Sequence, residues 1–137
     1  MKPRQRAKAL ITRRDGMHVG VRGWLEPWRR RWSLPGGGLE QGETPEEALW
    51  RELEEEIAFT CPGDNLHTTT YLGAHTHWVF YIGLPYKTVT HLFRIELRGD
   101  ITLSPSREIR VAQWVHPDAF TETLAEYTEL LKGIQKM

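Results

Sequence analysis

Three glutamates in the stretch LWRELEEEI have a spacing that could assemble a metal site. Glu52, Glu55 and Glu56 occupy positions i, i+3 and i+4, so they share one face if this stretch is helical. Like charges at that spacing destabilise a helix by roughly a few tenths of a kcal/mol each. Two interpretations are open. The face is either solvated with Arg51 as its local partner, or it binds a hard cation such as Mg2+, which prefers oxygen ligands.

A glycine turn just before these glutamates favours the metal site. Gly36, Gly37 and Gly38 can adopt backbone conformations closed to other residues and can approach a ligand closely. Pro35 restricts the backbone that leads into the turn. A glycine turn beside an acidic face therefore indicates metal-assisted chemistry on a phosphate-containing substrate.

The glutamates are placed on a helix by clear start signals. Thr44 is a suitable N-cap, Pro45 suits the first helical position, and Glu47 completes a capping box. The apolar residues recur every four positions and predict a second face that packs on a core; they are Leu49, Leu53 and Ile57. One face of the helix is thus expected to pack, and another to carry the charge.

Residues 37–59 resemble the signature of the Nudix hydrolases, G-x5-E-x7-R-E-U-x-E-E-x-G-U, in which U is a bulky apolar residue. Gly37, Glu43 and Arg51 stand in register with it, followed by the three glutamates. Only Ala58 departs, because the family has glycine there. Two exits from the helix are open: Ala58 adopts the left-handed conformation at a cost of roughly 1 kcal/mol, or the helix continues through Thr60.

The resemblance implies hydrolysis of a nucleoside diphosphate linked to a further moiety, dependent on Mg2+ or Mn2+. Carried over by position, Glu55 and Glu56 are the principal metal ligands, and Glu52 is a ligand or the base that accepts a proton from water. The carbonyl of Gly37 is a further expected ligand.

The resemblance also suggests supporting residues and one late metal ligand. Arg51 is expected to hold the glutamates in place by ion pairing, and Glu43 to brace Arg51. Glu108 resembles a late glutamate that reaches the metal from beyond the sheet, and Glu96 is the alternative.

The resemblance implies a three-layer α/β/α sandwich with a mixed sheet, and residues 1–137 are expected to form a single domain. Strand-forming residues and the turn at Asp15-Gly16 predict a first hairpin, and the residues after Pro117 predict one C-terminal helix. The predicted strands are residues 7–12, 17–21, 66–72, 76–84, 88–97 and 109–115, with residues 83–87 as a connection.

The charges balance at 18 basic and 18 acidic residues, but basic residues gather near the start and acidic ones at 40–56. A single cysteine, Cys61, allows no internal disulfide, and no apolar run of membrane-spanning length or signal pattern is seen. A cytoplasmic protein is expected, as a monomer or homodimer without membrane contact.

Substrate-binding candidates lie around the loop GWLEPWRRRWS. Trp28, Arg29 and Arg31 could stack on a base or bind phosphates, or this loop could be a packed lid or a partner contact. Arg22 stands where the resemblance implies an arginine close to the phosphates, and the alternative is a plain surface residue. Trp32 is expected to pack beneath the glycine turn. The terminal basic residues Lys2, Arg4 and Arg6 are interpreted as solvated.

The later histidines are interpreted as ordinary strand residues, since no acidic or cysteine companions suggest a zinc site. They are His75, His77 and His91. His77 and Tyr81 lie beside the expected cleft, where contact with a nucleotide is an open alternative.

The substrate is inferred by elimination, because the subclass motifs for ADP-ribose, dinucleoside polyphosphates and coenzyme A are missing. A nucleoside or deoxynucleoside triphosphate is the first choice. The enzymatic alternatives are a nucleotide sugar or a capped RNA end. A non-catalytic nucleotide- or RNA-binding module would be expected to lose glutamates that this chain retains.

Overall fold

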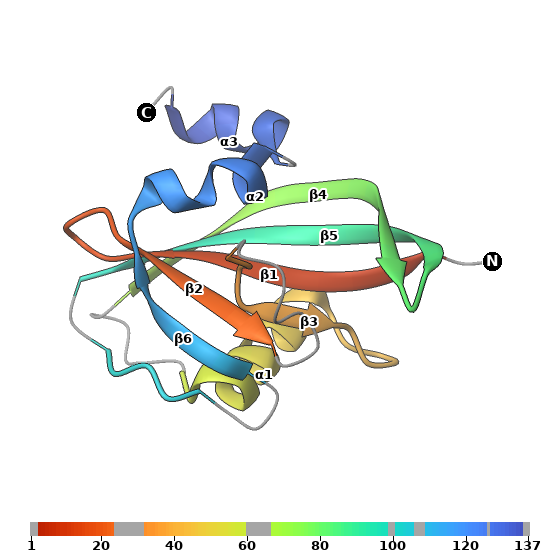
Figure 1. Cartoon of the computed structure of the whole chain (residues 1–137), viewed down its shortest axis with the longest axis horizontal. Coiled ribbons are helices and arrows are strands. Elements are labelled where there is room, and N and C mark those ends of the chain that lie inside the picture. Colours follow the sequence, from red (N-terminus) through yellow and green to blue (C-terminus); the bar gives the residue numbers. More distant parts are fainter. Residues whose placement is uncertain are drawn as a thin grey trace.

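The computed structural model describes residues 3–23, 32–59, 67–98, 101–105, 109–125 and 127–135. Figure 1 shows a twisted sheet with α1 (Pro45–Ile57) on one face and the C-terminal helical segments on the other. The predicted α/β/α sandwich with a mixed sheet is confirmed. None of the described helices is long and apolar enough to span a membrane.

The sheet has the strand order β4-β5-β1-β2-β6, with β3 paired to β1. The parallel pair is β1 with β5, while the other pairs are antiparallel. The strands are β1 Arg4–Thr12, β2 His18–Gly23, β3 Gly36–Gly38, β4 His67–Tyr81, β5 Leu84–Leu97 and β6 Ile109–Val115. The predicted first hairpin is present, although β2 then pairs with β6 along its length.

Successive side chains of β1 point to opposite faces of the sheet and pack into two separate cores. Ala7, Ala9 and Ile11 are buried in the cluster that includes Leu49 and Leu53 of α1. The opposite face of the sheet packs on the C-terminal segments in a second cluster of Leu10, Trp32, Leu34, Leu92, Val115, Phe120 and Tyr127. Even-numbered residues of β1 therefore face away from α1.

The two strands predicted at residues 66–72 and 76–84 form a single strand, so their separation in the sequence-based prediction was wrong. β4 is continuous, with a register shift between Tyr71 and Gly73. Gly73 has φ of 127°, and a Cβ there would lie 2.8 Å from Leu130 Cδ2, so the glycine makes a bulge under a helix. The predicted connection 83–87 is also wrong, because Ile82 and Gly83, at φ 51° and 76°, form a two-residue turn.

The single C-terminal helix expected after Pro117 is divided into three segments. They are the 3-10 turn Pro117–Phe120, α2 Thr121–Ala125 and α3 Thr128–Gln135. The Thr128 hydroxyl donates to the Ala125 carbonyl at 2.8 Å, an interaction that competes with helical continuation. The apolar residues of these segments nevertheless pack together, since Phe120 and Tyr127 are buried and Leu124, Leu130 and Leu131 pack against them.

Helix α1 ends in the left-handed conformation rather than continuing through residue 60. Ala58 has φ 56° and ψ 27°, and its N–H donates to the carbonyl of Glu54 at 3.1 Å. The N–H of Phe59 donates to the carbonyl of Leu53, also at 3.1 Å. Phe59 is buried, so the turn directs an apolar side chain back into the core.

We expect Ala58→Gly to raise the free energy of unfolding by about 1 kcal/mol, because glycine removes the steric cost of the left-handed conformation. Gly42→Ala is the matched control. Gly42 has φ of 86° with open space around it, so alanine there introduces the same strain without a clash. Chemical denaturation should show a higher free energy of unfolding for Ala58→Gly and a lower one for Gly42→Ala. A lower value for Ala58→Gly would contradict backbone strain at Ala58.

Candidate active site

The capping box fixes the position where α1 begins. The Glu47 N–H donates to Thr44 Oγ1 at 3.1 Å, and the Thr44 N–H donates to Glu47 Oε1 at 3.0 Å. This start places Leu49, Leu53 and Ile57 in the core. The predicted glutamates then follow on the side of the helix that meets the glycine turn.

Glu56 joins the helix to that turn. Its side chain is buried, and Oε1 accepts a hydrogen bond of 2.5 Å from the N–H of Gly36. Gly36 has φ of 136°, and a Cβ there would collide with the backbone carbonyl of Ala7. The turn is thus held between α1 and β1 at a position that only glycine fits.

Glu52 lies directly against Gly37. A Cβ on Gly37 would be 2.5 Å from Cδ of Glu52, so the carboxylate occupies the space that a side chain would need. Burial raises the pKa of Glu52, although the hydrogen bond from Arg51 opposes that shift. A carboxylate with a raised pKa binds a proton more readily, which suits a base.

Arg51 is the centre of an ion-pair network on α1. Its Nε and NH2 donate to Glu43 at 2.7 and 2.9 Å, and NH2 also donates to the carbonyl of Gly38 at 2.9 Å. Its NH1 contacts Glu52 at 2.9 Å and the half-exposed Glu55 at 3.2 Å. One guanidinium therefore connects two of the three glutamates to the glycine turn, the arrangement expected from the sequence.

Acid should weaken the fold through Glu43, because the hydrogen bond from Arg51 lowers its pKa from 4.5 to about 2. With a folded-state pKa below the unfolded one, this stabilisation is present above about pH 4.5 and is lost as pH falls towards 2. We expect wild type to lose more stability than Glu43→Gln between these pH values. An equal loss of stability in wild type and in Glu43→Gln as the pH falls would contradict a contribution of the Glu43–Arg51 pair to stability.

The donor set suits a hard divalent cation. The groups that would hold it are the carboxylates of Glu55 and Glu56 and the carbonyl of Gly37, all oxygen donors as Mg2+ prefers. Glu52 lies beside them as a further ligand or as the base. Among the described residues, no three acidic, histidine or cysteine side chains converge as a preformed cluster. Instead Arg51 holds Glu52 and Glu55, and the Gly36 N–H holds Glu56.

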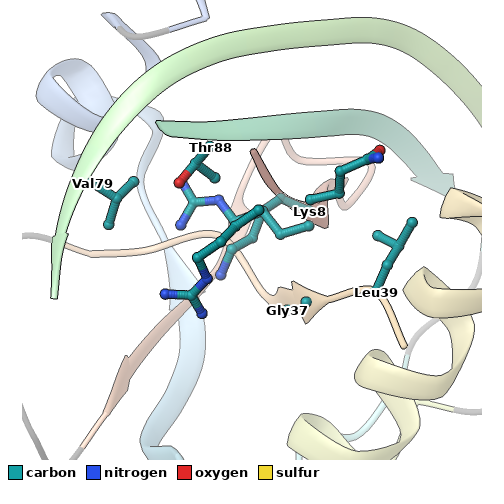
Figure 2. Close-up of a pocket in the computed structure, with 9 residues that line it drawn as sticks. Lys8, Gly37, Leu39, Val79 and Thr88 are labelled. Atoms are coloured by element: carbon teal, nitrogen blue, oxygen red, sulfur yellow. The ribbon is translucent and has the colours of Figure 1, made fainter. Parts of the chain in front are cut away.

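A cavity of about 400 Å³ opens on the side of the glycine turn that faces away from α1 (Figure 2). Its described lining is Arg4, Gln5, Arg6, Lys8, Gly37, Gly38, Leu39, Val79 and Thr88. The interpretation of Arg6 as simply solvated was wrong, because it is half-buried and hydrogen-bonded, while Arg4 is exposed but also lines the cavity. The period-two spacing of residues 4, 6 and 8 in a strand was the signal that could have indicated a shared face.

Lys8 supports the glycine turn, a role that sequence reasoning missed. Its Nζ donates to the carbonyls of Leu34 and Gly36, each at 3.1 Å. The turn is therefore held from both sides, by Glu56 through an N–H and by Lys8 through carbonyls.

Arg22 and Trp32 pack on one another. The Arg22 guanidinium lies 3.8 Å from the centre of the Trp32 ring, and Trp32 is only 8% exposed. Trp32 is a packed residue, in the cluster that includes Leu34 and Phe120, whereas its predicted position beneath the glycine turn stays a prediction. Arg22 is not among the described residues that line the cavity, and its phosphate role stays a prediction.

The other predicted binding residues are divided between described and undescribed parts of the chain. Trp28, Arg29, Arg31 and Glu108 lie outside the described residues, as does the side chain of Tyr81. Glu96 is exposed and pairs with Arg94 at 3.3 Å. The histidines lie on strands as expected: His75 and His77 have edge contacts with Tyr127, and His91 contacts Tyr71 and Gln5.

The sequence matches a known family along most of its length. The family model described as NUDIX domain matches residues 2–133. An RNA pyrophosphohydrolase from Photobacterium profundum is 39% identical over 59 residues, which are 39% of this chain and 31% of that protein. The RNA pyrophosphohydrolase of a Sulfurovum species is 43% identical over 53 residues, 39% of this chain and 29% of that protein. The chain thus spans about a third of the length of these curated relatives.

Solved structures share the fold. The dihydroneopterin triphosphate pyrophosphohydrolase of E. coli superposes with a TM-score of 0.76 at 17% identity, covering 97% of this chain and 96% of that one. A MutT protein from Methanosarcina mazei Go1 gives a TM-score of 0.65 at 24% identity, covering 98% and 95%.

Proposed function

Because this chain belongs to the Nudix family, we propose that it is a metal-dependent hydrolase of phosphoanhydride bonds in compounds that contain a nucleoside diphosphate. The observation that carries the proposal is the position of Gly37. On one side it meets the carboxylate of Glu52, and on the other it lines a cavity with three cationic side chains. A phosphate chain bound across this turn would meet both groups.

The protein's own residues supply the positioning and the proton transfer. A bound Mg2+ would neutralise charge on the phosphoryl oxygens and lower the pKa of a water ligand. Glu55 and Glu56, with the carbonyl of Gly37, are the proposed ligands. Glu52 accepts the proton of the attacking water, in keeping with its raised pKa. As the water oxygen bonds to phosphorus, the anhydride P–O bond breaks and the leaving phosphate keeps the electron pair.

A nucleoside or deoxynucleoside triphosphate is the proposed substrate. A 5′-triphosphate RNA end is a second candidate, because the two curated relatives described above are RNA pyrophosphohydrolases. Both candidates present a chain of phosphates to the same site.

A substrate panel with Mg2+ tests the proposal. Nucleoside triphosphates, a short 5′-triphosphorylated RNA and a nucleotide sugar are compared by release of phosphate, pyrophosphate or sugar phosphate. We expect hydrolysis of a triphosphate. Hydrolysis of the nucleotide sugar alone would favour that alternative, and binding without hydrolysis of any compound would indicate a non-catalytic module.

A further inference from the structure

The cavity beside Gly37 has a strongly basic lining. Arg4, Arg6 and Lys8 alternate along β1 and therefore share one face of the sheet, with Gly37 and Gly38 forming another part of the wall (Figure 2). None of the nine described lining residues is acidic or aromatic. Since bases are commonly bound by stacking on aromatic side chains, this composition suits phosphate better than a nucleobase.

Arg6 is held in place by Thr90 and His77. Its Nε donates to Thr90 Oγ1 at 2.7 Å, and its NH2 lies 3.3 Å from His77 Nε2. His77 Nε2 is in turn 2.7 Å from the Thr90 hydroxyl, and Thr90 is fully buried. These contacts use only part of the five N–H donors of a guanidinium, so Arg6 is oriented while it keeps donors for a ligand.

The other residues around the cavity extend the basic surface. The Arg4 guanidinium lies 5.5 Å from the centre of the Tyr86 ring, and the buried Thr88 donates to the Tyr86 carbonyl at 3.2 Å. Lys8 holds the glycine turn between this surface and Glu52. The acidic and basic parts of the site are thus separated by a single turn of backbone.

We propose that Arg4 and Arg6 form an anion subsite that binds a further phosphate of the substrate, beyond the two phosphates that flank the cleaved bond. The subsite selects triphosphate chains over nucleotide sugars, in which the diphosphate is attached to a sugar and not to a third phosphate. Its use in selecting substrates rests on the proposed function, whereas anion binding by the subsite does not. Arginine suits the role because its planar donors match phosphate oxygens and its charge persists at any physiological pH.

Binding of inorganic tripolyphosphate in metal-free buffer tests the subsite without turnover. By calorimetry, we expect wild type to bind tripolyphosphate more tightly than pyrophosphate, and Arg4→Gln/Arg6→Gln to weaken tripolyphosphate binding at least tenfold. Arg14→Gln is the matched control, because Arg14 is exposed near the far end of β1 and outside the cavity. Arg4→Gln alone should weaken binding in the same direction, which keeps the test valid if the double variant folds poorly.

Two further measurements separate the subsite from the proposed chemistry. Glu55→Gln should bind tripolyphosphate at least as well as wild type, because Glu55 does not line the cavity. In Mg2+, the ratio of kcat/KM for a triphosphate to that for a nucleotide sugar should fall at least tenfold in the double arginine variant. Unchanged tripolyphosphate binding in both arginine variants would overturn the subsite. So would an equal fall in kcat/KM for the triphosphate and for the nucleotide sugar in the double variant. Absence of hydrolysis with tripolyphosphate binding as expected would overturn the enzymatic proposal and leave the subsite supported.

Discussion

Replacing Glu55 or Glu56 by Gln is expected to lower turnover by about two to three orders of magnitude, since each change removes a proposed metal ligand and its charge from the transition state. Neither variant should unfold. Glu55 is half-exposed, and a glutamine at position 56 keeps a carbonyl oxygen that can accept from the Gly36 N–H. The measurement is kcat at saturating Mg2+ and substrate, together with the melting temperature.

Glu54→Gln is the matched control for these two variants. Glu54 is an exposed residue of the same helix, next to Glu55, and lies outside the set of proposed ligands. The same loss of one negative charge there should leave kcat nearly unchanged. Near-normal Mg2+-dependent turnover in both Glu55→Gln and Glu56→Gln would remove these residues from the metal site.

Alanine substitutions along the glycine turn should have three different outcomes. Gly36→Ala is expected to destabilise the protein by about 3 kcal/mol or more, because the new methyl group collides with the β1 backbone at a left-handed φ. Gly37→Ala should leave the fold intact, since the obstructing atoms are the end of the flexible Glu52 side chain. Its kcat should nevertheless fall by about 10- to 100-fold, as displacement of a proton-accepting group lowers general-base catalysis.

Gly38→Ala is the control within the turn. A Cβ there would meet only the Gln5 carbonyl at 3.8 Å, an ordinary contact, so both melting and kcat should stay close to wild type. Equal effects of the three substitutions on stability would contradict the distinct environments of these glycines. Unchanged turnover in Gly37→Ala would show that the position of Glu52 against Gly37 is not needed for the reaction.

Local patterns in the sequence were sufficient for the centre of the site. The capping box at Thr44 determines where α1 begins, and the apolar spacing of Leu49 and Leu53 determines which face of it packs. The start of the helix and the face that carries the glutamates could therefore be inferred without tertiary information. The exit at Ala58 could be narrowed to two alternatives, because alanine tolerates either one at a small cost.

Long-range contacts are what the sequence did not reveal. Arg6 and Thr90 meet because β1 and β5 pair in parallel, although 84 positions separate them in the chain. Two strands were predicted at residues 66–72 and 76–84, whereas Gly73 between them makes a bulge beneath Leu130 in one continuous strand. In each case the partner that determines the conformation comes from a distant segment, and local propensity carries no information about it.

Hydrolysis of a nucleoside triphosphate in water labelled with heavy oxygen tests the enzymatic proposal most directly. Wild-type protein with Mg2+ should release a phosphate-containing product that has gained one labelled oxygen for each anhydride bond cleaved, because water attacks phosphorus. Chelation of the metal should abolish both release and labelling. Unlabelled product, or an undiminished rate after chelation, would contradict metal-dependent attack by water at this site.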